Sequence, residues 1–188
     1  MLSFSRDADR LPALAAETGA RTGTPREAVE FGEAVMFSVP WRAVDDVLAQ
    51  TGSLDGKVVI DTTNQYGEDG WEQLPKPAAE VNADRMPGAR LVKAFNTLTS
   101  SFQGEAGGRG VAMFLAGEDA DAKQIVAGLI RDIGFEPVDV GGFAEVPIME
   151  APRRDGAVYG EEYRLPEAEK VIEAVKAGEG IPPAPTYE

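Results

Sequence analysis

The chain has 188 residues, of which 32 are acidic and 18 basic, so its formal net charge is −14, and it contains neither cysteine nor histidine. The missing residue types exclude a disulfide, a Cys/His zinc site, a cysteine nucleophile, a Ser-His-Asp triad and acid–base catalysis by imidazole. The negative charge opposes phosphate backbones, and no apolar run approaches the roughly 18 residues of a membrane span. We therefore expect a cytoplasmic globular protein with no nucleic-acid or membrane partner.

The length suits one domain, and no linker or internal repeat divides the chain. We expect a single domain over residues 1–180. The proline-rich end, residues 181–188, is expected to be an extended tail that is either packed on the body or loose.

Short apolar runs alternate with segments of helical period, which is typical of an α/β sheet with crossover helices. Strands are predicted at 2–5, 34–39, 57–61, 90–95, 111–116 and 136–140. Helices are predicted near 9–17, 25–31, 41–48, 78–86, 125–133 and 166–177.

For two of these segments the sequence predicts which residues are buried. The run over 34–39 is almost continuously apolar, which predicts a strand buried on both faces. The helix near 125–133 is predicted to place all its large aliphatic residues inward, namely Ile125, Val126, Leu129, Ile130 and Ile133.

Polar side chains gather where four predicted strands end. In open α/β sheets, ligands bind beyond the carboxyl ends of the strands, so these clusters are candidate site residues. The clusters are Ser3-Phe4-Ser5-Arg6, Ser38-Val39-Pro40-Trp41, Asp61-Thr62-Thr63-Asn64 and Lys93-Ala94-Phe95-Asn96-Thr97. An arginine with small hydroxyls at the tip of a second strand is the arrangement that holds a ribose 2′-phosphate.

Each cluster also has a structural interpretation, which the residues alone leave open. Arg6 can pair with a nearby acid, Asp61 can close its strand by binding backbone amides, and Lys93 can be a charge at a strand edge. Asn96 or Thr97 can cap the following helix, and Trp41 can be a packing aromatic.

The order of the motifs resembles the family of NADP-dependent oxidoreductases that reduce or oxidise coenzyme F(420), an 8-hydroxy-5-deazaflavin. The resemblance rests on LSFSR, SVPWRAVDDVL, GKVVIDTTN, LPKPAAEV and RLVKAFNTL, and it continues through MEAPRR and PPAPTY. It implies a Rossmann-like α/β domain, a mostly parallel sheet with helices on both faces, that binds NADP across the strand ends.

The resemblance also implies roles for particular residues. Ser5 and Arg6, with Ser3 nearby, match the residues at the 2′-phosphate. Val39, Pro40 and Trp41 match the turn beside the adenosine and pyrophosphate half, and Asn96 and Thr97 match residues near the nicotinamide. The resemblance assigns no catalytic side chain and no metal ligand, because hydride passes directly between cofactor and acceptor carbons.

One departure from the family pattern lies at the start of the sequence. The family begins with a strand, a glycine-rich turn and a helix, whereas Met1 here stands at the second strand. We expect an N-terminally truncated Rossmann-like domain and, because a shortened sheet exposes strand edges, a homodimer. Upstream codons for the missing unit would support this hypothesis, and an upstream stop codon would contradict it.

Two other function classes remain open at this stage. One is a non-catalytic NADP-binding or interaction module, and the other is a reductase of a different small-molecule acceptor such as an imine, a ketone or ferric iron. Measured NADP binding without hydride transfer would favour the first, and a screen of acceptors would identify the second.

The truncation hypothesis generates a prediction about affinity. The Ser5–Arg6 pair can hold one phosphate, but no glycine-rich turn cradles the pyrophosphate. We therefore expect the purified chain to bind NADP weakly in a calorimetric titration, and a sub-micromolar dissociation constant would contradict the prediction.

Overall fold

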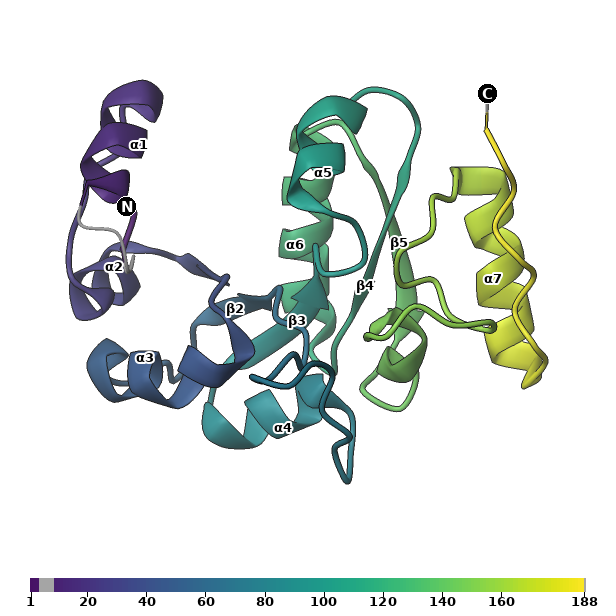
Figure 1. Cartoon of the computed structure of the whole chain (residues 1–188), viewed down its shortest axis with the longest axis horizontal. Helices are drawn as coiled ribbons and strands as arrows, with labels where there is room; N and C mark the ends of the chain where they lie inside the picture. Colours follow the sequence, from purple (N-terminus) through teal and green to yellow (C-terminus); the bar gives the residue numbers. More distant parts are fainter. Residues whose placement is uncertain (4–8, 188) are drawn as a thin grey trace.

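The structure is a computed structural model and describes residues 1–3 and 9–187. Its centre is one five-stranded sheet in the order β1-β2-β3-β4-β5, and Figure 1 shows the helices arranged around it. The strands are β1 (Ala34–Phe37), β2 (Val58–Asp61), β3 (Arg90–Ala94), β4 (Ala112–Ala116) and β5 (Glu136–Gly141). Pairing is parallel except between β3 and β4, which are antiparallel. The Rossmann-like, mostly parallel α/β architecture expected from the sequence is confirmed.

Helices cover the two faces of this sheet, because successive side chains of a strand point to opposite sides. One face packs against α3 (Val44–Thr51), α4 (Ala78–Arg85), the short helix η2 (Val146–Met149) and α7 (Leu165–Ala177). The other face packs against α5 (Ser100–Ala106) and α6 (Ala120–Asp132).

The N-terminal segment lies at the β1–β2 side of the molecule (Figure 1) and contains α1 (Arg10–Thr18) and α2 (Pro25–Phe31). Thr24 caps α2 as expected: its hydroxyl accepts from the Glu27 amide at 3.2 Å, and Glu27 returns a bond to the Thr24 amide at 2.8 Å. The predicted first strand is not a strand over the described residues 1–3, where Leu2 forms only an isolated parallel bridge with Thr22. The remainder of that predicted strand falls on residues 4 and 5, outside the described residues.

The prediction that residues 34–39 are buried on both faces is wrong. The strand β1 is the edge of the sheet, and Met36 in its middle is 56% exposed, whereas Phe37 is buried. The other apolar run, β2, is buried at all four positions because strands flank it on both sides.

The burial predicted for α6 is half right. Val126 and Ile130 are fully buried against the sheet, but Ile125, Leu129 and Ile133 are 45%, 39% and 51% exposed. A helix that packs only on a sheet buries one stripe, here Ala122, Val126 and Ile130 at spacings of four. The neighbouring aliphatic stripe is turned to the solvent side.

The C-terminal tail packs on the body. The Tyr163 hydroxyl donates to the Pro182 carbonyl at 3.0 Å, and the Arg164 amide donates to the Tyr187 hydroxyl at 2.9 Å. Within the described ranges, no helix has both the length and the apolar character needed to cross a bilayer.

The split of α6 into a buried and an exposed stripe gives a stability prediction. Ile130→Ala should lower the free energy of unfolding by about 3 kcal/mol, because it opens a cavity in the core. Ile125→Ala, the matched control on the same helix, should change it by less than about 0.5 kcal/mol. Urea denaturation followed by circular dichroism measures both, and equal losses would contradict the observed burial.

Candidate functional site

Two adjoining cavities lie where β1 and β2 end. The larger, about 760 Å³, lies beside β1 and the N-terminal segment, and the smaller, about 490 Å³, lies over the loop that follows β2. Ser38, Val39 and Pro40 line both cavities, so the turn after β1 separates them. The two cavities meet at this turn and are together called the depression; of the two, the smaller lies over the carboxyl ends of both strands.

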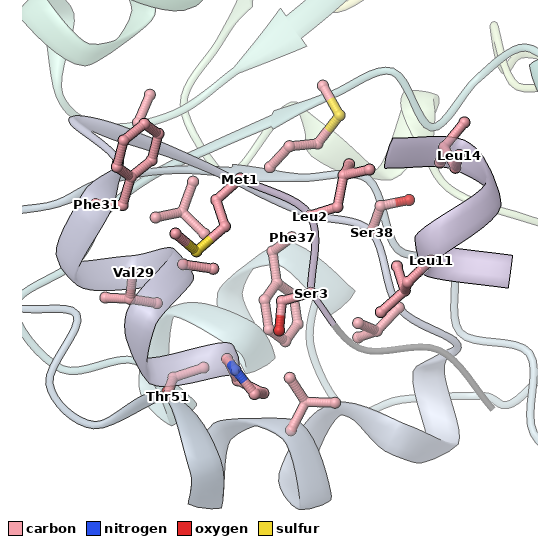
Figure 2. Close-up of a pocket in the computed structure, with 18 of the residues that line it drawn as sticks. Met1, Leu2, Ser3, Leu11, Leu14, Val29, Phe31, Phe37, Ser38 and Thr51 are labelled. Carbon is pink, nitrogen blue, oxygen red and sulfur yellow. The ribbon is translucent and has the colours of Figure 1, made fainter. Parts of the chain in front are cut away.

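The larger cavity contains one of the predicted phosphate-binding residues. Figure 2 shows Ser3 and Ser38 among mainly apolar neighbours such as Leu11, Val29 and Phe37. The Ser3 hydroxyl is buried and has no hydrogen-bond partner among the described residues. Ser5 and Arg6, the other two predicted phosphate ligands, lie outside the described residues.

Trp41 forms a packed wall of the smaller cavity. It is 6% exposed, its indole N–H donates to Glu72 Oε2 at 2.9 Å, and the Arg85 guanidinium lies 4.7 Å from the ring centroid. The first turn of α3, which follows, contains Asp45 and Asp46. Since Trp41 has both its ring and its N–H occupied, it shapes the cavity rather than presenting a free stacking face.

Asp61 and Lys93 form a buried ion pair between β2 and β3. Lys93 Nζ lies 3.1 Å from Asp61 Oδ2, and both side chains are fully buried. Asp61 Oδ1 accepts from the Thr63 amide at 2.9 Å, and Asn82 of α4 donates to both Asp61 Oδ2 and Thr63 Oγ1 at 3.0 Å. Lys93 also donates to the Thr63 carbonyl. The structural interpretation of Asp61 is therefore correct, and Lys93 is its counter-ion rather than an edge charge.

Asn96 and Asn64 pair across the ends of β3 and β2. Asn64 Nδ2 donates to the Asn96 carbonyl at 3.0 Å, and Asn96 Nδ2 donates to Asn64 Oδ1 at 3.2 Å and to the Met149 carbonyl at 2.7 Å. Asn64 lines the smaller cavity, whereas Asn96 and Thr97 do not line either cavity. The structure thus joins Asn96 to the smaller cavity through Asn64, and Thr97 lines neither cavity.

Asn96 and Thr97 nevertheless retain unused hydrogen-bonding capacity. Within the part of the chain that the structure describes, Asn96 Oδ1 and Thr97 Oγ1 are buried without a partner. Neither residue caps α5, because Thr99 does so through the Phe102 amide at 3.3 Å. A buried polar atom without a partner costs about 1–3 kcal/mol, so these two atoms are candidates to bind a ligand or a water molecule.

Phe95 adds strain at the same place. Among the described residues other than glycine, Phe95 alone has a positive φ, which is +62°. A left-handed conformation costs of order 1–3 kcal/mol in a residue with a large side chain and typically occurs at functional sites. The strained residue immediately precedes Asn96.

Several residues at this edge were not found by sequence reasoning. Residues 146–163 close over the end of β3: the Gly160 amide donates to the Thr97 carbonyl at 2.8 Å, and Glu150 accepts from the Ala78 and Ala79 amides at 2.9 Å each. Gln65 is buried, and its Oε1 also has no partner in the described ranges. These contacts join segments up to 72 positions apart, and no local pattern in the sequence signals them.

The buried ion pair gives a stability prediction. Lys93→Met should lower the free energy of unfolding by about 3–5 kcal/mol, because the Asp61 carboxylate stays buried after losing its cation. Lys76→Met is the matched control, since Lys76 pairs with Glu80 and Asp84 at the surface. Exposed pairs contribute little, so the control should unfold at the parent's urea midpoint. A parent-like midpoint for Lys93→Met would contradict the prediction.

Comparisons with known sequences identify similar proteins. The family model of NADP oxidoreductases that depend on coenzyme F(420) matches residues 1–65. A curated relative, metalloreductase STEAP3 of Rattus norvegicus, is 28% identical over 148 residues, which are 78% of this chain and 29% of the relative. The chain therefore spans less than a third of the length of that relative.

Solved structures share the fold. Protein SMa0349 of Sinorhizobium meliloti superposes with a TM-score of 0.74 at 27% identity, over 87% of this chain and 82% of its own. A protein of Arthrobacter sp. assigned as an F(420)-dependent NADP-reductase gives 0.57 at 24% identity, over 65% and 61%. A reductive aminase from Aspergillus terreus in complex with NADPH gives 0.55 at 21% identity, over 74% and 46%. The chain is thus similar to the coenzyme F(420)-dependent NADP oxidoreductases over its first 65 residues, and the resemblance drawn from its motifs is confirmed.

Proposed function

We propose that this chain is the NADP-binding part of an oxidoreductase that transfers hydride between NADPH and a deazaflavin or a similar small-molecule acceptor. The proposal rests on the depression beside β1 and β2. Ser3, Val39 and Pro40 line its larger cavity. Open α/β sheets bind dinucleotides at this edge. The family match and the NADPH complex of a protein of the same fold support the choice of cofactor.

The two ends of the depression fit the two ends of NADP. At one end the Ser3 hydroxyl is unpartnered among the described residues, as suits a group that binds a ribose phosphate. At the other end Asn64 lines the smaller cavity and is hydrogen-bonded to Asn96, the residue that the resemblance matches to the nicotinamide half. Ser5 and Arg6 complete the phosphate end in this proposal, and Val39, Pro40 and Trp41 flank the adenosine half.

The middle of the depression fits NADP less well. A pyrophosphate needs backbone amides or cations, and among the residues that line the smaller cavity Arg42 has the one cationic side chain. The nearby helix terminus, that of α3, has Asp45 and Asp46 in its first turn, and their charges repel phosphate. This observation favours a second candidate, a module that binds the cofactor weakly without turnover.

When bound, NADPH supplies the hydride. The side chains then need only hold the cofactor in the correct position relative to the acceptor. Asn96 is suited to this because three hydrogen bonds fix its amide and its carbonyl against Asn64 and Met149. The buried Asp61–Lys93 pair holds Thr63 in the cavity wall.

The proposal is tested by measuring cofactor preference in variants that remove one hydroxyl. Ser3→Ala should weaken binding of NADPH about fivefold, the loss of one hydrogen bond, and leave binding of NADH unchanged. Ser53→Ala, on the turn after α3, is the matched control and should change neither. Equal binding of the two cofactors, unaffected by Ser3→Ala, would contradict the assignment of the phosphate end.

Catalysis is tested separately with the same protein. Loss of NADPH absorbance is followed with a deazaflavin, an imine, a ketone and a ferric chelate as acceptors. Hydride transfer to an organic acceptor, or electron transfer to the ferric chelate, supports an oxidoreductase and identifies the acceptor, whereas binding without transfer supports the module.

A further inference from the structure

Three aliphatic side chains of α6 face the solvent. Ile125, Leu129 and Ile133 are 45%, 39% and 51% exposed and belong to neither hydrophobic core. Their spacing of four places them along one side of the helix, next to the stripe that packs on the sheet. None of them lines either cavity, so this side of α6, here called the α6 face, lies outside the candidate site.

A glycine lies in the middle of the α6 face. Gly128 is three positions after Ile125 and one before Leu129, inside a helix of 13 residues. A β-carbon at this position would meet no atom within 4 Å outside its own helix. Glycine is the least favourable residue of a helix interior apart from proline, and neither a positive φ nor a close neighbour requires it here. Small residues on a helix surface allow a second helix to approach closely.

Opposite charges stand at the two ends of the α6 face. Asp121 lies in the first turn, four positions before Ile125, and Arg131 lies in the last turn. Within the described ranges neither side chain forms a salt bridge. Arg90, which attracts Asp121, is itself held by Asp119 through two hydrogen bonds. Both ends of the face are therefore open to a charged group from another molecule.

A second copy of the chain complements this face. If two α6 helices cross antiparallel on a twofold axis at Gly128, residues equally far before and after this position lie opposite each other. Asp121 then lies about one helical turn from the second copy's Arg131, within reach of its long side chain. Asp132 comes opposite the second copy's Gln124, whose amide can donate to it. Symmetry repeats each contact, so both ends of the face are matched.

We propose that the chain forms a homodimer in which the α6 faces of two copies pack antiparallel across Gly128, with Ile125 and Leu129 of each copy flanking the crossing. The inference is independent of the proposed cofactor. It assigns the dimer to a helix rather than to a sheet edge, the feature from which the sequence predicted a homodimer. An interface built on one helix per copy is small, so the dissociation constant is expected to be in the micromolar range.

Sedimentation velocity from about 1 µM to about 1 mM protein measures the association. Ile125→Ala and Leu129→Ala should each weaken it about tenfold, because each removes apolar area that only the dimer buries. Leu165→Ala is the matched control, since it removes a 38% exposed leucine from the start of α7, and it should associate like the parent. A parent that stays monomeric at every concentration, or α6 variants that associate like the parent, would overturn the proposal.

Gly128→Ala separates association from folding, because the two effects have opposite signs. Alanine is the better helix former, so the urea midpoint should rise when it is measured below the dissociation constant, where the chain is monomeric. Association should weaken about tenfold, since the two added methyl groups meet at the crossing. A Gly128→Ala protein that associates like the parent would contradict a crossing at this residue.

Reversal of the end charges tests the antiparallel direction. Asp121→Arg and Arg131→Asp each place like charges near one another and should weaken association about fivefold. The variant with both changes restores opposite charges with their signs exchanged and should associate within about twofold of the parent. Failure of the double variant to recover would exclude this arrangement. The α6 face lies outside both cavities, so NADPH binding by every variant should match the parent, and failure of the dimer leaves the proposed function standing.

Discussion

The burial of one ammonium and one carboxylate between β2 and β3 is the constraint on which the ligand edge of this protein depends. Transferring either charge alone into the core costs several kcal/mol, so each requires the other together with further hydrogen bonds. Asn82 and the Thr63 backbone supply those bonds, and thereby α4, β2 and β3 are joined at one point. A buried ion pair contributes little net stability against an apolar core, and its effect here is to fix the position of the loop after β2.

Above this fully hydrogen-bonded pair, the chain has buried polar atoms without hydrogen-bond partners. Ser3, Gln65, Asn96 and Thr97 each have a buried oxygen without a partner in the described ranges. Three of them lie on the loops after β2 and β3, directly beyond a network in which every charged atom is bonded. A protein that satisfies its deepest polar groups and leaves the next layer unpaired is prepared for a ligand or for ordered water.

The sheet and its helices could be predicted because each element carries its own pattern. The apolar runs at β2 and β4, the Thr24-Pro25 start of α2 and the spacing of α7 are local signals. Burial was harder to predict, since it depends on neighbours. The run at β1 has the composition of a central strand, yet β1 is the edge strand of the sheet and Met36 is exposed. In α6, the sequence does not say how wide a stripe the sheet covers.

The residues of the candidate site likewise include some that the sequence indicates and some that it does not. Strand-end residues were found because a polar cluster after an apolar run is visible in the sequence, and Asp61, Asn64 and Asn96 do converge. Glu150 and Gly160 were missed, because they reach the edge only through contacts with residues more than sixty positions earlier. The strain at Phe95 has a consequence for engineering this chain. Replacing Phe95 by glycine would relieve the left-handed backbone, but it would also remove a ring that packs on the core and loosen the peptide next to Asn96, so relief of the strain and order at this edge oppose each other.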